Sequence, residues 1–301
     1  MKIILGGDTH GDRNHVRWLL DKAQRREADG VLVLGDFGVW DHSDGGAFTK
    51  GVAADAERCG MPLWFLPGNH ENYDLLEEWE RDNPRHEDGS VLVHGSAYLR
   101  YSPRGHRWEW EGWKFLSLGG AYSVDKDWRI EADLNGLYQI EERQSRGHKL
   151  TSKQEYLKKT GRSLWWPQEE ITEEEAKSAA KGGVVDIMFA HDKPMDAELA
   201  WNRKDFPETH ANQIYLQKVV DATKPRLYLH GHFHYAYSDH LLRTNTTVVG
   251  LDCEPDGSRS SGGSGDRKQS WALLELEPSM ATLSVQDHGG TMRKTFFPSD
   301  R

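Results

Sequence analysis

The sequence predicts an α/β protein, and two observations support this prediction. Five short apolar runs lack regular polar alternation, which is typical of strands covered on both faces. They span residues 3–5, 31–34, 63–66, 184–189 and 227–229. Helical patterns separate the first three runs, and strands that alternate with helices indicate an α/β sheet.

The helices expected early in the chain follow from apolar spacing. Val16, Leu19, Leu20 and Ala23 recur at positions i, i+3, i+4 and i+7, and Gly30 is a suitable stop. Two further helices are expected, over residues 47–59 and 73–81.

Later parts of the chain change to short strands with turn signals. We expect these strands to form a second, antiparallel or mixed sheet packed on the first. They lie at 91–93, 97–101, 108–118, 236–240, 245–250, 271–276 and 281–286.

We expect one domain over residues 1–301, with two unusual segments. Residues 130–163 are polar, and 141–162 carry seven Lys or Arg against three Glu. This segment is either a solvated helical insertion or a basic cap over a phosphate site. Thr172 opens a short helix with a capping box, and a flexible Gly/Ser loop is expected at about 256–269.

Composition excludes several classes of protein. Hydrophobic residues make up 37% of the 301 residues, so the chain is polar, but its 12 Trp make it too aromatic for a disordered chain. The net charge of −10 argues against broad, sequence-independent binding of nucleic acid. Cys59 and Cys253 are expected to be free thiols in a reducing cytoplasm. No run approaches the ~20 apolar residues of a membrane span, and no signal peptide is recognisable.

Polar side chains follow each of the five predicted buried strands. The carboxyl ends of neighbouring strands in an open α/β sheet meet at one crevice, where ligands bind. We therefore expect these side chains to converge, although they are far apart in sequence. They are Asp8, His10, Asp36, Asn69, His70, His191, His232 and His234.

This set of residue types predicts a pair of divalent cations. Two cations about 3.5–4 Å apart can hold a bridging water, lower its pKa and neutralise oxygens at phosphorus. Carboxylates offset the charge, and imidazoles suit Mn, Fe, Zn or Ni better than Mg or Ca. Each fragment alone has a structural explanation as a turn or a cap, but the five together favour a metal site.

The ordered motifs resemble the calcineurin-like metallophosphoesterase superfamily. Its pattern of D-x-H, GD, GNH[DE], a single His and GH-x-H is present over essentially the whole chain. The resemblance implies a four-layer α/β/β/α sandwich and two metal sites that share Asp36 as a bridge. The first site would contain Asp8, His10, Asp36 and His234, and the second Asp36, Asn69, His191 and His232. By the same resemblance, His70 is a general acid or charge stabiliser near the leaving group.

Two further segments, 119–129 and 165–170, resemble a phage and bacterial subgroup of the superfamily. In that subgroup the first segment approaches the metals, so Arg129 would contact a phosphate oxygen through its planar fork; the alternative is a structural ion pair. Trp165 and Trp166 would either stack on a base or sugar or pack in the core. His230 is expected to support the site or pack in the core.

The sequence departs from the superfamily's protein phosphatases. Those enzymes carry GD-x-x-DRG at the second motif, whereas residues 35–41 here read GDFGVWD. This departure argues against protein phosphatase activity and favours phosphodiesters or small phosphomonoesters as substrates.

The leading hypothesis is a two-metal phosphoesterase, with Mn²⁺ favoured and Fe, Zn or Ni as alternatives. A metal-activated hydroxide would attack the phosphorus of a nucleotide or other small phosphoester. The alternatives are a nuclease, which needs a basic groove, and a binding scaffold without catalysis, which the intact ligand set argues against. Nucleic acid and membrane are not the expected partners, the expected location is cytoplasmic (a host cytoplasm if the gene is viral), and no oligomeric state is specified.

Overall fold

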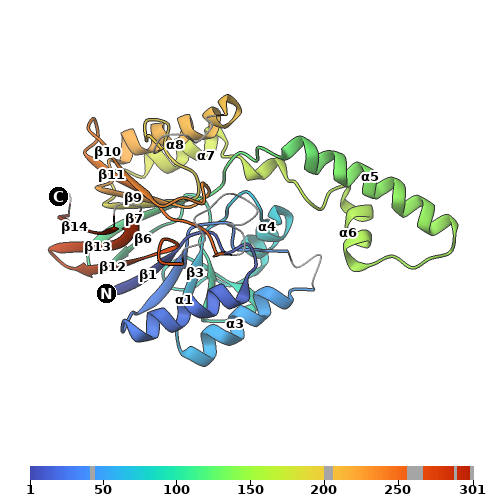
Figure 1. Ribbon diagram of the computed structural model, residues 1–301, viewed down its shortest axis with the longest axis horizontal. Coiled ribbons are helices and arrows are strands. Elements are labelled where there is room, and N and C mark those ends of the chain that lie inside the picture. The colour runs from blue at the N-terminus through green and yellow to red at the C-terminus, as the bar shows by residue number, and fades with distance from the viewer. Residues whose placement is uncertain (41–44, 200–205, 256–266, 288–289, 299–301) are drawn as a thin grey trace.

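Two mixed β-sheets stacked face to face form the body of the protein (Figure 1). The computed structural model describes residues 1–40, 45–199, 206–255, 267–287 and 290–298. The first sheet has eight strands in the order β14-β13-β12-β1-β2-β3-β5-β4, and the second has six in the order β10-β11-β9-β8-β7-β6. Both contain parallel and antiparallel pairs, so the predicted α/β class with two mixed sheets is confirmed.

The strand bounds agree closely with the predicted runs. The first sheet contains β1 (Lys2–Gly6), β2 (Gly30–Val33), β3 (Leu63–Phe65), β4 (Val91–Leu92), β5 (Leu99–Tyr101), β12 (Trp271–Glu277), β13 (Met280–Asp287) and β14 (Gly290–Phe296). The second contains β6 (Arg107–Trp110), β7 (Trp113–Leu118), β8 (Ile187–Ala190), β9 (Leu227–His230), β10 (Tyr237–Leu241) and β11 (Thr246–Gly250). Strand β14 was not among the predicted strands.

The membership of the two sheets differs from the prediction. Strands β4, β5, β12 and β13 were expected in the second sheet, but they join the first, where β12 pairs antiparallel with β1. Conversely β8 and β9 belong to the second sheet and pair with β7 and β11. The apolar pattern of a strand shows which of its faces are buried. Its membership of a sheet depends instead on the neighbouring strand with which it pairs, which the pattern does not show.

Helices cover the outer face of each sheet. The helices α1 (Arg13–Arg25), α3 (Ala47–Cys59) and α4 (Tyr73–Asp82) lie on the first sheet, and α7 (Glu173–Lys181) and α8 (His210–Thr223) on the second (Figure 1). Alternate residues of a strand point to opposite faces. Accordingly Val31 packs in the core under the helices, while Leu32 packs in the core between the sheets. A third apolar core lies beneath α7 and α8, which completes the four layers.

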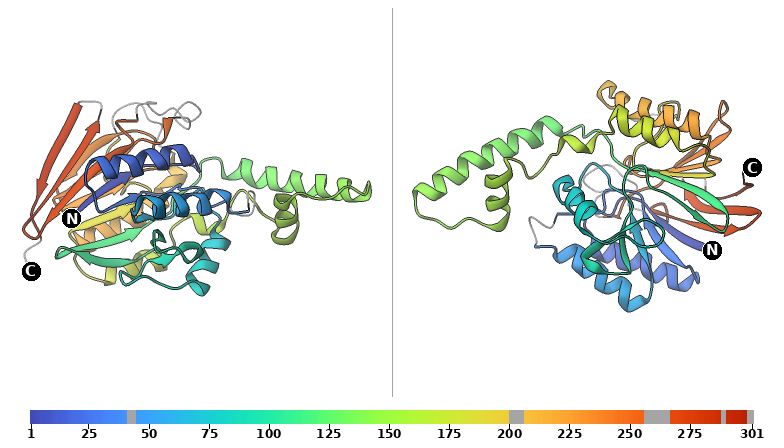
Figure 2. Two further views of the ribbon diagram at one scale, coloured as in Figure 1. Left: turned by 90° about the horizontal axis from the view of Figure 1, so that it is seen from below. Right: turned by 180° about the vertical axis from the view of Figure 1, so that it is seen from behind.

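A helical arm projects from one end of this body. It consists of α5 (Lys126–Ser145) and α6 (Ser152–Thr160), which extend away from the sheets in Figures 1 and 2. Polar contacts anchor its base: the buried Asp133 carboxylate accepts hydrogen bonds from Ser163 Oγ and from the Ser163 and Leu164 backbone amides. Tyr156 Oη also donates to Asp74 at 2.8 Å. The arm therefore has a defined attachment beside α4.

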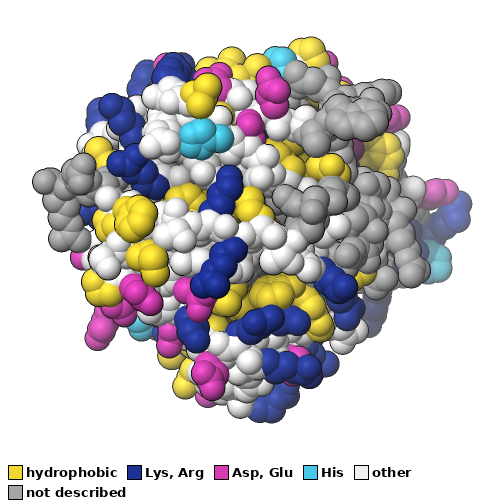
Figure 3. Space-filling model, turned by 60° about the vertical axis from the view of Figure 1, so that its left-hand side comes forward, with side chains coloured by type: hydrophobic (Ala, Val, Ile, Leu, Met, Phe, Trp, Pro, Cys, Tyr) yellow, Lys and Arg dark blue, Asp and Glu magenta, His cyan; other side chains and the backbone are white. Residues whose placement is uncertain are grey.

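The remaining sequence expectations concern cysteines, membrane spans and surface charge. Cys59 and Cys253 are free thiols, as predicted. None of the described helices combines the length and apolarity needed to cross a bilayer. The predicted Gly/Ser loop falls largely on residues 256–266, which lie outside the described residues. On the face shown in Figure 3, basic, acidic and hydrophobic side chains are interspersed.

A buried carboxylate joins α1 to α3. Asp55 is fully buried on α3 and accepts hydrogen bonds from Arg13 Nε at 2.6 Å, Arg17 Nε at 2.7 Å and Arg58 Nη2 at 2.8 Å. Burial alone raises the pKa of Asp55, but Arg13 and Arg17 outweigh it and hold the pKa well below its usual range. The folded state is therefore stabilised by the ionised carboxylate.

We expect the substitution Asp55→Asn to destabilise the protein by about 2 kcal/mol at pH 7, because a buried hub of three ion pairs loses its charge. A group whose pKa is depressed on folding contributes stability above its unfolded pKa, and this contribution is lost as pH falls. The difference in unfolding free energy between wild type and variant should therefore shrink below about pH 5. Urea titrations at several pH values measure it. The control is Asp21→Asn on α1, where a half-buried carboxylate pairs, within the described residues, with Arg25 alone. A difference that stays constant with pH would contradict this account.

Candidate metal centre

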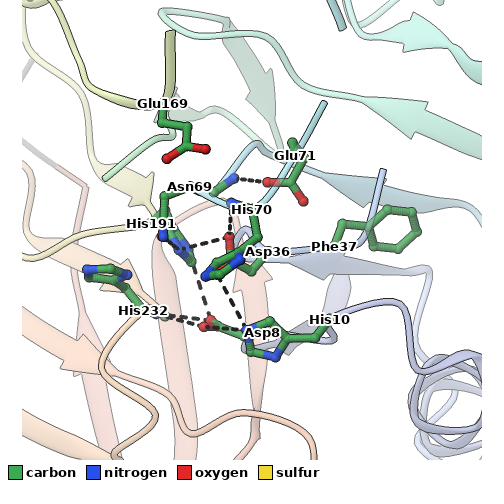
Figure 4. A network of polar contacts seen from close by, with 12 residues as sticks. Asp8, His10, Asp36, Phe37, Asn69, His70, Glu71, Glu169, His191 and His232 are labelled. Carbon is green, nitrogen blue, oxygen red and sulfur yellow. Dashed lines mark hydrogen bonds and ion pairs between the residues drawn. The ribbon is translucent and has the colours of Figure 1, made fainter. Parts of the chain in front are cut away.

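The polar residues that follow the five strands converge at one edge of the sandwich. Strands β1, β2 and β3 of the first sheet and β8 and β9 of the second carry Asp8, Asp36, Asn69, His191 and His232 beyond their carboxyl ends. Figure 4 shows these side chains facing one another. The structure thus brings together the residues that the sequence predicts to be metal ligands.

The backbone at this edge is in an unusual conformation. Four of the predicted ligands have a left-handed φ, which non-glycine residues rarely adopt: His10 at 41°, Asp36 at 44°, His232 at 68° and His234 at 50°. Such strain persists where the surrounding structure enforces it, and it concentrates at functional sites.

Two glycines allow the backbone to approach the carboxylates. A Cβ atom on Gly68 would collide with the Asp36 carboxylate, and one on Gly231 would collide with that of Asp8. Because the GNH and GH-x-H turns place these glycines against the acids, the backbone amide of His70 donates to Asp36 at 2.9 Å and that of His232 to Asp8 at 3.0 Å.

Two groups of side chains have ligand atoms close enough to share a cation. Asp8, His10 and His234 form one group and Asp8, Asp36 and His191 the other, with all ligand atoms of a group within 4.8 Å of one another. In the first, His234 Nε2 lies 2.9 Å from Asp8 Oδ2. Asp8 is common to both groups. Asp36 of the second group also reaches the first, since its Oδ2 is 3.4 Å from His10 Nε2 while its Oδ1 is 3.4 Å from His191 Nε2.

The tautomers of two histidines leave a nitrogen available as a ligand. His191 Nδ1 donates to the Leu34 carbonyl at 2.8 Å, and His10 Nδ1 donates to Glu254 Oε2 at 2.8 Å. Both Nε2 atoms therefore face the site. His191 Nε2 also lies 3.0 Å from Asn69 Oδ1, whose amide nitrogen donates to Ser123 Oγ. An oxygen and a nitrogen ligand thus point at the same space, which is the arrangement that a cation requires.

The site favours positive charge. Asp8 and Asp36 are buried, and among the described residues no Lys or Arg side chain pairs with either carboxylate. Burial raises the pKa of Asp8, but His191 and His234 outweigh it and lower the pKa to about 2. Burial lowers the pKa of His191, but Asp36 and Asp8 raise it to about 10. Two ionised carboxylates that lack basic partners, surrounded by imidazoles, fit divalent transition-metal ions.

His70 and Arg129 lie together at the rim of this centre. Arg129 Nη2 is 2.8 Å from His70 Nδ1 and 2.7 Å from His70 Nε2, while its Nη1 donates to the Asn69 carbonyl at 3.2 Å. Burial and the Arg129 charge lower the pKa of His70 to about 4, against the opposing effect of Asp36. Arg129 is also paired with Asp125 and Glu169. The structure therefore shows the ion pair that was one of its two interpretations, and contact with a phosphate oxygen stays a prediction.

Of the two alternatives given for Trp165 and Trp166, the structure supports core packing for Trp166 and separates it from Trp165. Trp166 is only 1% exposed, packs in the core under the helices and donates from Nε1 to Asp74 at 3.1 Å. Its covered ring cannot stack on a base. Trp165 is half-buried, and the ammonium of Lys126 lies 4.7 Å from its ring centroid. His230 is buried and accepts a hydrogen bond from Tyr237 Oη at 2.8 Å, behind the ligand turn.

Three buried carboxylates that support the site were not predicted. Glu71 accepts hydrogen bonds from the Gly38 and Gly68 amides and so ties two ligand turns together, and burial raises its pKa to about 7. Glu169 accepts from Ser123, and burial raises its pKa to about 8. Glu71 belongs to the GNHE motif and could have been singled out. Glu254 belongs to no motif, and only the fold shows that its carboxylate accepts a hydrogen bond from His10.

Comparison with known proteins gives a family match for this chain. A family model described as calcineurin-like phosphoesterase matches residues 1–236, a range that includes all the predicted ligands. Solved structures of similar fold include TT1561 of Thermus thermophilus, with 12% identity over 97% of each chain and a TM-score of 0.48. Another is a dimetal phosphatase from Danio rerio, with 13% identity over 99% of each chain and a TM-score of 0.49. No curated protein sequence matches. On the family match, the chain belongs to the calcineurin-like phosphoesterase family and is a metal-dependent hydrolase of phosphoester bonds.

Proposed function

We propose that the protein hydrolyses phosphoesters of a nucleotide or another small molecule with two divalent cations. The observation that carries this proposal is the pair of Asp/His groups that meet at the shared sheet edge. One cation would bind Asp8, His10, Asp36 and His234, and the other Asp36, Asn69, His191 and His232. Asp36 is the bridging ligand in this proposal because each of its oxygens faces a histidine of a different group.

The proposed metal is Mn²⁺, and Fe, Zn or Ni are also compatible with this donor set. The site offers imidazole, carboxylate and amide ligands, and Cys253, the nearer thiol in the fold, donates its S–H to the Glu254 carbonyl. When bound, the cations would supply Lewis acidity at the phosphate and lower the pKa of the attacking water.

The chain's own groups position the substrate and stabilise the leaving group. Arg129 has a planar guanidinium that holds the His70 ring, and His70 Nε2 in turn lies 3.8 Å from Asp36 Oδ2. His70 stands at the rim, where it would donate a proton to the departing oxygen or stabilise its charge. Glu71 and Glu254 hold the ligand turns and so reduce the reorganisation needed when a cation binds.

The proposal is tested by hydrolysis of bis-p-nitrophenyl phosphate with Mn²⁺, with and without a chelator. We expect the substitution Asp36→Asn to lower kcat by about a thousandfold, equivalent to about 4 kcal/mol of transition-state stabilisation. Metal content measured by mass spectrometry should fall as well. The exposed Asp82→Asn on α4 serves as control. Wild-type turnover with a full metal complement in Asp36→Asn would refute the bridging role.

Glu254 offers a test of ligand positioning. Because its carboxylate orients His10 through Nδ1, the substitution Glu254→Gln should weaken Mn²⁺ affinity by about tenfold, as measured by titration calorimetry. Saturating Mn²⁺ should restore most of the activity, which a directly catalytic role would not allow. The matched control is Glu275→Gln on β12. Unchanged affinity in Glu254→Gln would show that His10 needs no such support.

The role of His70 is tested with esters of different leaving groups. Poor leaving groups such as alkoxides need protonation or charge stabilisation more than nitrophenolate does. The substitution His70→Ala should therefore slow alkyl esters about a hundredfold more than nitrophenyl esters, in a series of kcat/KM values. The exposed His240→Ala is the control. Equal losses on both classes would exclude a role at the leaving group.

A further inference from the structure

A cleft opens on the side of the metal centre where His70 lies. Its volume is about 300 Å³, at the small end of ligand sites in proteins. Side chains from the sandwich and from both helices of the arm line it: Trp40, His70, Asp125, Trp128, Arg129, Lys153, Ser163, Leu164 and Trp166. Because His70 and Arg129 belong to the proposed catalytic machinery, a group that departs past His70 would enter this cleft.

Two tryptophans of the cleft offer ring surface to a ligand. Trp40 is anchored, since its Nε1 donates to the His70 carbonyl at 2.5 Å. Trp128 lies in the first turn of α5, directly before Arg129, and is 64% exposed. A large aromatic side chain left in solvent beside a catalytic group is available to stack on a planar ligand. These are different tryptophans from the pair predicted from the sequence.

The charges in the cleft favour an additional anionic group on the ligand. Asp125 is paired with Arg129 Nε at 2.9 Å, and Arg129 is further engaged with Glu169. Lys153 on α6 is exposed, and within the described part of the chain its ammonium makes no hydrogen bond or ion pair. The cleft therefore contains an ammonium group that is not neutralised by an acidic neighbour.

We propose that this cleft is a leaving-group subsite for a nucleoside that carries a further phosphate. The base stacks on Trp128 against the wall formed by Trp40, and the further phosphate meets Lys153. This inference rests on the proposed function. In the reaction, a water oxygen bonds to phosphorus, the P–O bond to the nucleoside breaks, and the nucleoside oxygen leaves with a proton. The small cleft and the net charge of −10 favour a short nucleotide over a long nucleic acid.

The stacking role is tested by comparing two substrates that share one nucleotide. One is thymidylyl-thymidine, which releases a nucleoside, and the other is the methyl ester of thymidine monophosphate. Wild type should prefer the dinucleoside in kcat/KM, and Trp128→Ala should reduce that preference about tenfold, the equivalent of one stacked base. Trp128→Phe should retain part of it. Tyr138→Ala is the matched control, because Tyr138 is an exposed aromatic residue on the same helix, outside the cleft.

The proposed role of the Lys153 charge is tested with thymidylyl-thymidine that carries a further phosphate on the nucleoside that leaves. Lys153→Ala should abolish the gain in kcat/KM that this phosphate gives to wild type, and about 0.5 M salt should reduce the same gain in wild type. Lys159→Ala, on the same helix and outside the cleft, should keep it. A longer oligonucleotide that is preferred in a Lys159-dependent way would instead indicate a nucleic-acid track along the arm and overturn the short-nucleotide assignment.

The outcomes separate this inference from the proposed function. If wild type hydrolyses bis-p-nitrophenyl phosphate with Mn²⁺ but Trp128→Ala leaves the substrate preference intact, the subsite assignment is wrong and the function stands. The subsite assignment would also be wrong if wild type preferred aryl to nucleoside leaving groups and if this preference depended on Trp128. If wild type hydrolyses none of these esters, the proposed function itself fails.

Discussion

The confinement of two carboxylates in one buried space is the constraint on which the site depends. The fold brings Asp8 and Asp36 together at the edge where both sheets end, and no described Lys or Arg pairs with either. Their mutual repulsion and their burial both disfavour ionisation, yet the surrounding imidazoles keep both acids ionised. A site built in this way gains stability from any cation that occupies it, because the cation relieves the repulsion.

Much of the nearby backbone maintains this confinement. Left-handed residues in the ligand turns and the glycines at 68 and 231 let peptide amides donate to the two acids. Glu71 links the turns after β2 and β3 through their amides, and Glu254 orients His10. Hydrogen bonds and the strand ends therefore hold the ligands and their turns in place. Such preorganisation lowers the cost of binding a cation and of reaching the transition state.

The arm connects this rigid centre to the cleft that we propose as the leaving-group subsite. Its base supplies Arg129, which contacts His70, and the same helix carries the exposed Trp128 one residue earlier. Helix α6 contributes Lys153 to the same cleft. The acidic body and the basic outer arm are therefore arranged so that uncompensated positive charge lies near the site where phosphate chemistry is proposed. In the functions proposed above, the body of the fold holds the cations and the arm contributes to selecting the ester.

Sequence patterns alone were sufficient to predict the α/β class, most strand positions and the set of Asp, Asn and His residues at the strand ends. This prediction succeeded because strand burial and turn chemistry are local properties, and because strands of this kind end at a common edge.

The patterns could not assign β4, β5, β12 and β13 to the first sheet, since pairing partners are chosen by long-range packing. They left open whether Trp166 stacks on a ligand or packs in the core, and they did not single out Trp128 and Trp40, which line the cleft of the proposed subsite. Glu254 carried no local signal, because its contact with His10 joins residues 244 positions apart. Local sequence thus determined which chemistry the chain carries, while only the tertiary structure decided which side chains support and surround it, because those contacts depend on distances that no short stretch of sequence contains.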